Sequence, residues 1–598
     1  MSGRAADHWQ ALLLVGLVSA APYLATATAG FVWDDKTHVI DNPAIRSFRP
    51  LHAFTVRYWE HEFAWPGLYR PMYALTLAAD FALWGQRAGG YHVTSLLLHA
   101  LASIAVCWLV ATWTGRWPVA VVAGLAFGVL PCHVEAVAWV KNRNEVLTGL
   151  CSALSVACFW RAVRGRLHLG WWLAALAAFA CALCSKPSAV VVPALAAAVV
   201  LLGLRGRARW SGLVWTLPMW LGAGAFMTFR LAMFSSATFA NLRGAPDMSV
   251  LQQLSIVADT FLFYVRMLLA PLHMAPLHGL ELLPSVAWAE SSRLALAALL
   301  GAGLVWAAWR SRHRAWVVWL AVGLAPLVNL KIIACRPLAE QRLYLASIGL
   351  CAWGAGALVR RGRSSWLAAL ALVPLAALSV HQVGHWRSDS TLWRQAMRVS
   401  PGVARVQEWR GLSVLEYGRK RLAEKHLRRA TELDPTLAAP WDELGKLWSE
   451  QRKFADAERA FQAAIAAQGN WSAPHNDLGA RYAVMGRWDA AVASFDNALA
   501  IQPNDARAAT NRARALVRMA RERVSQRQID AALACLSRID SAQLVAAAVQ
   551  VEAHTLAAQL LLTKGRGKQA LEHINAALRL RPADPALRQL KQRADASD

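Results

Sequence analysis

The chain has 598 residues, of which 56% are hydrophobic and 29 are tryptophan, and its formal net charge is +26. Soluble domains are usually about 45–50% apolar, so the composition excludes a protein without a membrane part. The positive charge does not indicate nucleic acid, because the arginines form short clusters between apolar stretches, as the positive-inside rule predicts for polytopic membrane proteins. No basic strip with interleaved aromatic side chains occurs, and we expect no nucleic-acid partner.

Apolar stretches of about 20 residues recur as far as residue 382 and predict eleven membrane spans. They lie at 10–29, 91–112, 119–138, 146–163, 169–184, 188–204, 211–229, 293–309, 316–333, 342–359 and 365–382. A cytoplasmic N-terminus places every arginine cluster inside, provided that 253–270 lies at the interface or re-enters without crossing. Cleavage of 9–29 as a signal peptide is the alternative for the first span, and the many spans that follow favour its retention.

This topology places three long stretches on the outer side, namely 30–90, 230–292 and everything after about 383. The sequence therefore predicts an all-α chain of two domains, a polytopic membrane helix bundle at 1–387 and a soluble domain at 388–598. The composition is rich in alanine, arginine and tryptophan, which is typical of a bacterial chain. We accordingly expect an integral protein of the bacterial inner membrane whose outer side faces the periplasm.

A period of 34 residues marks the soluble domain. One copy consists of Trp441, Leu444, Gly445, Trp448, Ala457, Phe461 and Ala464, and the next of His475, Leu478, Gly479, Tyr482, Ala491, Phe495 and Ala498. Partial copies lie at 411–435 and 570–582, and 506–550 is a degenerate copy with an insertion. Small residues at fixed positions let paired helices touch, which is the pattern of tetratricopeptide repeats. Such repeats stack into an α-solenoid whose concave surface suits an extended peptide.

Two adjacent acids, Asp34 and Asp35, follow the first predicted span directly. A carboxylate at the mouth of a membrane bundle stays wet enough to ionise and can accept a proton from an acceptor hydroxyl. The pair alone is a weak signal, because aspartate is common in loops and at helix N-caps. Among the basic residues on the predicted outer side, Lys186 and Arg342 are the best candidates for binding an anion. They lie between apolar spans, where a bare charge is costly.

Several sequence blocks occur in a fixed order along the chain. They are Phe31-Val32-Trp33-Asp34-Asp35 with Asp41-Asn42-Pro43, Tyr69-Arg70-Pro71 with Asp80 and Trp84-Gly85, Tyr91-His92 with Leu97-Leu98-His99, His133-Val134-Glu135-Ala136-Val137-Ala138-Trp139 with Arg143-Asn144-Glu145, Lys186-Pro187, and Glu340-Gln341-Arg342-Leu343-Tyr344-Leu345 with Ser347-Ile348-Gly349. Together with the repeats, this ordered set resembles the transmembrane and tetratricopeptide repeat-containing O-mannosyltransferases and their bacterial relatives.

The resemblance implies a GT-C type glycosyltransferase in the membrane bundle. Such an enzyme transfers a mannose-like sugar from a polyprenyl-phosphate-linked donor to a protein Ser or Thr hydroxyl, with inversion, and membrane lipids surround it. An acid in the first outer loop is the catalytic base of that superfamily, a role that falls on Asp34 and Asp35. The repeats would bind the protein or peptide acceptor.

The resemblance also implies residues for the donor phosphate and residues with accessory roles. Arg70, Arg143, Lys186 and Arg342 would bind the phosphate, and His92, His133, Glu135 and Glu145 are possible accessory residues. No cofactor is expected, because the lipid-linked sugar is a substrate. His133 and Glu135 do not complete a set of metal ligands, although some relatives use a divalent metal.

The sequence departs from the family pattern at two positions. Asn144 stands in a turn where many relatives show Gly-Arg-x-Glu/Asp, and Pro187 replaces an acid that follows the lysine in eukaryotic members. Cadherin-like acceptor domains are therefore poorly supported. Two alternatives stay open, a non-enzymatic membrane-anchored repeat scaffold for envelope assembly and a GT-C transferase that acts on a glycan or lipid.

Overall fold

The computed structural model describes residues 2–59, 68–164, 167–240, 250–278, 287–311, 313–327, 338–359, 365–539 and 544–596. All regular secondary structure in these ranges is helical, which confirms the predicted all-α class. The chain divides after Val403 into two compact units, and each is described by itself below. Parts of the expected outer stretches 30–90 and 230–292, and of the expected span at 316–333, lie outside the described residues.

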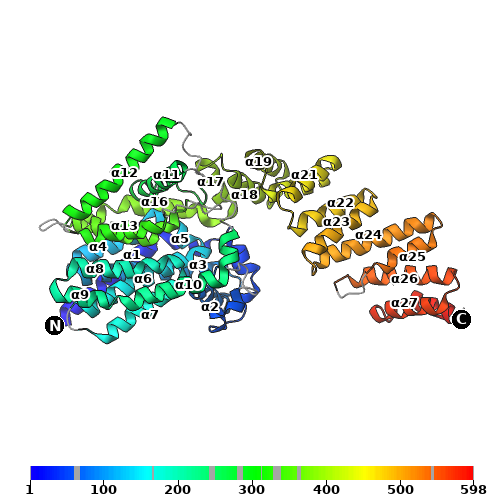
Figure 1. Ribbon diagram of the computed structural model, residues 1–598, viewed down its shortest axis with the longest axis horizontal. Coiled ribbons are helices and arrows are strands. Elements are labelled where there is room, and N and C mark those ends of the chain that lie inside the picture. Colours follow the sequence, from blue (N-terminus) through cyan, green and yellow to red (C-terminus); the bar gives the residue numbers. More distant parts are fainter. Residues whose placement is uncertain are drawn as a thin grey trace. The chain divides into compact units, whose positions relative to one another are not determined.

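The first unit contains the helices α1 to α17, most of which are labelled in Figure 1. They are α1 (Ser2–Ala20), α2 (Pro71–Trp84), α3 (Ala88–Thr114), α4 (Trp117–Val129), α5 (Val134–Ala138), α6 (Arg143–Val163), α7 (Leu169–Ser185), α8 (Val192–Gly203), α9 (Gly206–Val214), α10 (Leu217–Ala240), α11 (Val250–Leu269), α12 (Ala287–Arg310), α13 (Arg314–Leu324), α14 (Leu343–Leu358), α15 (Ser365–Leu370), α16 (Val373–Val383) and α17 (Asp389–Val399).

Among the described residues, five helical segments are long and apolar enough to cross a membrane. They are His8–Thr28, Ala88–Thr114, Val140–Val163, Gly206–Met233 and Leu367–Arg387. A sixth is possible if the bent pair Trp117–Val129 and Pro131–Ala138 counts as one span. The chain is therefore an integral membrane protein, whereas the count of eleven spans stays a prediction.

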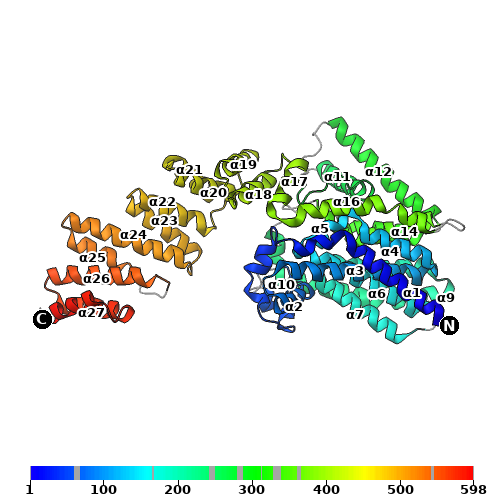
Figure 2. The ribbon, with the colours of Figure 1, turned by 180° about the vertical axis from the view of Figure 1, so that it is seen from behind.

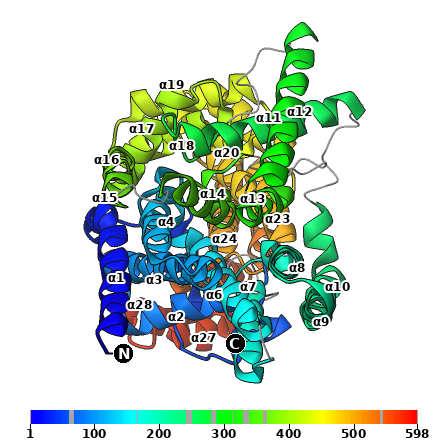
Figure 3. The ribbon, with the colours of Figure 1, turned by 90° about the vertical axis from the view of Figure 1, so that its left-hand side faces the viewer.

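Small residues let the helices of the first unit approach closely. A Cβ atom on Gly128 of α4 would lie 1.8 Å from Ser19 Oγ of α1, and one on Gly149 of α6 would lie 2.5 Å from the Tyr344 ring of α14. Small residues at such crossings are typical of membrane helices, whose association depends on close packing. Figure 3 shows α1, α3 and α4 side by side in this part of the unit, in agreement with their contacts.

The expected span at 119–138 is broken at Pro131. Helix α4 ends at Val129, and the following helical segment starts at Pro131 and turns by 55°. Proline has no N–H and disfavours a helical conformation at the residue before it, and Leu130 is extended. The break directs residues 131–142 across the end of the bundle, where they contact α6, α14 and the loop after α1.

The second unit consists of paired helices. They are α18 (Ala404–Leu415), α19 (Lys420–Leu433), α20 (Ala438–Glu450), α21 (Phe454–Ala467), α22 (Ser472–Val484), α23 (Trp488–Ile501), α24 (Ala506–Ser525), α25 (Ile529–Ser537), α26 (Ala547–Thr563), α27 (Gly567–Leu580) and α28 (Pro585–Asp595), seen from behind in Figure 2. A Cβ atom on Gly445 would lie 2.6 Å from the Phe461 ring, and one on Gly479 would lie 2.8 Å from the Phe495 ring. The same contact thus recurs after 34 residues, which confirms the tetratricopeptide repeats.

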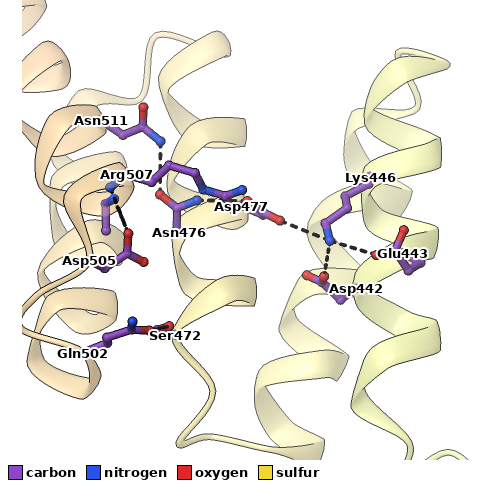
Figure 4. A network of polar contacts seen from close by, with 11 residues as sticks. Asp442, Glu443, Lys446, Ser472, Asn476, Asp477, Gln502, Asp505, Arg507 and Asn511 are labelled. Atoms are coloured by element: carbon purple, nitrogen blue, oxygen red, sulfur yellow. Dashed lines mark hydrogen bonds and ion pairs between the residues drawn. The ribbon is translucent and has the colours of Figure 1, made fainter. Parts of the chain in front are cut away.

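Polar side chains join the first helices of successive repeats, as Figure 4 shows. Lys446 of α20 pairs with Asp442 at 2.6 Å on its own helix and reaches Asp477 of α22 at 3.6 Å. Asp477 also pairs with Arg507 of α24 at 2.5 Å, and Asn511 donates to Asn476 at 3.1 Å. These contacts fix the position of each repeat against the next, in addition to the apolar contacts between them.

Candidate active site

The two adjacent acids lie in the short loop after α1 and its 3₁₀ continuation Ala21–Thr28, but their environments differ. Asp35 is fully buried, whereas the side chain of Asp34 is 17% exposed. Trp33, directly before the pair, has a left-handed backbone with φ of 52°. A non-glycine residue in this region costs about 1–3 kcal/mol and persists only where its surroundings hold it.

The carboxyl group of Asp35 accepts two backbone hydrogen bonds that hold the loop in place. Its Oδ1 accepts the Lys141 N–H at 2.8 Å, and its Oδ2 accepts the Val32 N–H at 3.3 Å. Burial raises the pKa of Asp35 to about 8, and the nearby charge of Asp34 adds to this, whereas the backbone hydrogen bonds oppose it. Full burial and two backbone hydrogen bonds suit Asp35 to holding the loop in place, whereas the partly exposed Asp34 can meet an acceptor hydroxyl.

Asp34 faces a basic side chain. Its Oδ2 pairs with Lys141 Nζ, and the same ammonium lies 4.8 Å from the centre of the Trp139 ring. Lys141 belongs to the short turn between α5 and α6 that the bend at Pro131 brings beneath the loop. The sequence alone gives Lys141 no role at the site, because its spacing from Asp34 carries no information about their contact.

Basic side chains at three helix ends lie close to one another. Arg70 caps the N-terminus of α2, Lys186 lies at the break after α7, and Arg342 precedes α14. Glu145, in the first turn of α6, pairs with Lys186 Nζ. Burial lowers the pKa of Lys186; the charge of Glu145 opposes this shift, and the positive charges of Arg70 and Arg342 add to it, so these four side chains form one electrostatic cluster.

A further cation, which sequence reasoning missed, adjoins this cluster. Arg230 Nη1 of α10 donates to the Leu68 carbonyl at 2.8 Å, and its charge acts on Arg70. Arg70 itself is buried at Nε, which has no hydrogen-bond partner in the described part of the chain. In the described part of the chain, Arg70, Lys186, Arg342 and Arg230 thus act on one another, and Glu145 pairs with Lys186. An excess of cations with an unsatisfied guanidinium donor suits an anionic group such as a phosphate.

Arg143, expected to bind phosphate, makes several buried contacts, and its Nη1 has no hydrogen-bond partner within the described residues. It is fully buried, its Nη2 lies 2.6 Å from Asp80 Oδ2, and the same nitrogen donates to the Tyr91 carbonyl at 2.8 Å. Its Nε donates to Ser95 Oγ at 3.1 Å. These partners belong to α2 and α3, so Arg143 ties the start of α6 to both helices.

The possible accessory residues are also dispersed. His92 Nε2 contacts the Gly30 carbonyl at 3.3 Å, and His133 Nε2 contacts Ser347 Oγ at 2.8 Å. Glu135 accepts the Gln341 N–H at 3.2 Å, next to Arg342. Glu145 pairs with Lys186 in the cation cluster. No group of three or more His, Cys, Asp or Glu side chains within the described ranges is placed to hold a metal ion, and the expectation of no resident cofactor stays a prediction.

An apolar cavity of about 260 Å³ lies between α11, α12, α13 and α14. Its lining contains Leu300, Leu304, Trp316, Leu320, Gly349 and Leu350, among other apolar residues. Gly349 follows Arg342 by seven residues on a helix, which corresponds to roughly 10 Å along its axis.

No protein-family model matches the chain. Human protein O-mannosyl-transferase TMTC4 is 25% identical over 487 residues, which cover 70% of this chain and 65% of the human protein. Protein O-mannosyl-transferase F38B6.6 of Caenorhabditis elegans is 23% identical over 459 residues, which cover 73% of this chain and 64% of the nematode protein. The chain thus matches less than two thirds of the length of either relative.

Solved structures similar to the chain are tetratricopeptide-repeat proteins. YrrB is 17% identical and covers 34% of this chain and 97% of its own, with a TM-score of 0.26. The C-terminal part of a repeat-containing protein from Cytophaga hutchinsonii is 17% identical and covers 37% of this chain and 82% of its own, with a TM-score of 0.27. The curated matches, however, confirm the resemblance carried by the ordered sequence blocks: the chain is a distant homologue of the TMTC protein O-mannosyl-transferases.

Proposed function

We propose that the chain is a membrane glycosyltransferase of the GT-C type that transfers a mannose-like sugar from a polyprenyl-phosphate carrier to a Ser or Thr hydroxyl of a protein. The observation that carries the proposal is the arrangement around the first loop, in which a partly exposed carboxylate lies beside a cluster of cations with an unsatisfied guanidinium donor. The names of the curated relatives support the same activity.

Asp34 is the general base of this reaction. It takes the proton of the acceptor hydroxyl as the oxygen forms a bond to the anomeric carbon. The bond between that carbon and the phosphate oxygen breaks, the electron pair leaves with the phosphate, and one displacement inverts the anomeric carbon. When the acceptor binds, the ion pair between Lys141 and Asp34 must break, or Asp34 must contact Lys141 and the acceptor hydroxyl at the same time. Asp35, buried and held by two backbone N–H groups, fixes the loop and does not take the proton.

Arg70, Lys186 and Arg342 bind the donor phosphate. A phosphate accepts two hydrogen bonds from a guanidinium fork, and an ammonium adds a point charge. Their positions at helix ends, on segments that α2, α7 and α14 hold in place, preorganise them for the charge that develops on the leaving group. The apolar cavity along α14 accommodates the first isoprene units of the carrier.

The tetratricopeptide unit recruits the protein acceptor, and the loop and the repeats face the same side of the membrane, the periplasm of a bacterial inner membrane. The repeat fold presents the first helices of successive repeats as a continuous surface. Lys446 and Arg507 have side chains that are 40% and 62% exposed on α20 and α24. A photo-crosslinking residue at either position should capture the acceptor, whereas one at Arg459, exposed on the second helix α21, should not.

The activity is tested with the full chain in lipid nanodiscs, radiolabelled mannosyl-phosphoryl-polyprenol and a Ser/Thr-rich peptide. Asp34→Asn should lower kcat by about 10²–10⁴, the usual contribution of a general base. Asp41→Asn is the matched control, because Asp41 is exposed in the same loop. Retained transfer in Asp34→Asn, with wild-type expression and melting, would refute the assignment and favour a non-enzymatic scaffold.

Donor binding is tested separately. Lys186→Met and Arg342→Met should each raise the donor KM by about tenfold or more, since a hydrogen bond to a charged group contributes about 1.5–3 kcal/mol. Arg46→Met is the control, because Arg46 is exposed outside the cluster. Unchanged donor KM in both variants would contradict the phosphate site.

A further inference from the structure

The segment that leads into α17 packs against the loop of the acidic pair. The Gly30 N–H donates to the Arg387 carbonyl at 3.1 Å. Asp389, the first residue of α17, accepts the Trp33 N–H through Oδ1 at 2.8 Å and pairs with Lys36 Nζ through Oδ2 at 2.8 Å. One carboxylate thus bridges the residues on either side of the acidic pair.

Helix α17 also holds the Trp33 side chain. The indole of Trp33 stacks on Trp139 with ring centres 4.5 Å apart and planes 3° from parallel. The Trp33 ring also meets Trp393 edge-on at 5.0 Å, and Trp393 is 1% exposed. Asp389 and Trp393 are four residues apart, so they lie on one face of the helix. Asp389 accepts a hydrogen bond from the Trp33 backbone, and Trp393 packs against the Trp33 ring.

These contacts explain how the loop keeps its strained conformation. Trp33 has a φ of 52°, which costs about 1–3 kcal/mol in isolation. Asp34 follows Trp33 in the chain, so the orientation of the Trp33 peptide sets where the Asp34 side chain can point. Without the acceptor at Asp389, the peptide of Trp33 would lose its hydrogen bond and the loop could relax to an unstrained backbone.

We propose that Asp389 and Trp393 are positioning residues that aim Asp34 in the sugar-transfer reaction. The inference rests on the proposed function of Asp34. It adds helix α17 to the active site, although none of the ordered sequence blocks includes this helix. Helix α17 is the last helix of the first unit and follows α16 in Figure 2. The chain continues from α17 to the repeats, which begin at Ala404. The segment that leads into the repeats therefore also supports the loop of the acidic pair.

The test uses the full chain in nanodiscs with saturating peptide and varied donor. Asp389→Ala removes both contacts and should lower kcat by about tenfold to a hundredfold, because small displacements of a reacting group are costly. The donor KM should change less than threefold. Asp389→Asn keeps an oxygen that accepts the Trp33 N–H and should retain most of kcat. Gln395→Ala is the matched control, because Gln395 lies on the same helix but donates to the Met274 carbonyl at 3.3 Å.

A second variant guards against a folding defect. Trp393→Leu leaves Asp389 in place and should lower kcat in the same direction with an unchanged donor KM. Wild-type kcat in both Asp389→Ala and Trp393→Leu would overturn the inference, and so would an equal loss in Asp389→Ala and Asp389→Asn. Wild-type kcat in Asp34→Asn would instead refute the proposed function itself, so the two failures are distinguishable.

Discussion

Removal of one member of the Arg143–Asp80 pair should destabilise the folded membrane unit, and not merely weaken the binding of the sugar donor. Arg143 is 0% exposed and Asp80 is 2% exposed, and 2.6 Å separates their charged atoms. The same guanidinium binds the Tyr91 carbonyl and Ser95 Oγ. The pair therefore joins α6 to α2, the helix whose N-terminus carries Arg70.

The expected magnitude follows from this burial. Arg143→Met leaves the Asp80 carboxylate with one remaining hydrogen bond, from Thr94 Oγ1 at 2.6 Å, and breaking a buried ion pair costs about 3–5 kcal/mol. Replacement of both partners, in Asp80→Leu/Arg143→Met, leaves no buried charge and should recover most of the loss. The double-mutant cycle should therefore give a coupling energy of about 3 kcal/mol.

The assay is the temperature at which half of the protein disappears from the monodisperse peak in size-exclusion chromatography. At roughly 2 °C per kcal/mol for a large domain, each single variant should lose about 6–10 °C, and the double variant much less. Exposed Arg46→Met should melt like the wild type. Arg143→Met with wild-type melting but a donor KM raised tenfold would refute this reasoning and restore Arg143 as a phosphate ligand.

Three further predictions concern titration, packing and charge. Burial raises the pKa of Asp35 from 3.8 to about 8, so between these pH values the folded state binds more protons than the unfolded state. The free energy of unfolding should therefore fall as the pH rises through this window. Asp35→Asn should abolish that dependence in melting curves recorded from pH 4 to 9. Gly445→Ala places a methyl group 2.6 Å from the Phe461 ring and should cost about 1–3 kcal/mol in thermal unfolding, whereas Gly402→Ala meets nothing within 4 Å and should be neutral. Glu145→Gln removes the carboxylate that pairs with Lys186 and should tighten donor binding severalfold in nanodisc titrations; weaker binding would contradict a phosphate at Lys186.

Local patterns predicted the repeats and much of the cation cluster. The repeats follow from sequence because Gly445 and Phe461 recur 34 residues later as Gly479 and Phe495, and each glycine is needed at a contact within one helix pair. Lys186 was recognisable because a charge between two apolar stretches needs a partner. Each of these signals is contained in one short segment.

Long-range contacts could not be predicted in this way. Arg143 and Asp80 are 63 positions apart, and nothing in the spacing says that a fully buried pair forms between α2 and α6. Asp389 lies 356 positions after Trp33, in a segment that reads as an ordinary capped helix start. The unequal burial of Asp34 and Asp35 is equally invisible, since Asp35 packs against a segment 106 positions away, whose Lys141 N–H it binds.

Backbone strain gives an independent reason to place the chemistry at this loop. In the described part of the first unit, the non-glycine residues with positive φ are Trp33 at 52° and Tyr69 at 28°. Each directly precedes a residue with a proposed role in the reaction, Asp34 in one case and Arg70 in the other. A left-handed non-glycine residue costs about 1–3 kcal/mol, and relaxation of either peptide would redirect the side chain that follows. A bundle that served only as an anchor would have no need to hold both peptides in this conformation, whereas a base and a phosphate ligand must point to one substrate.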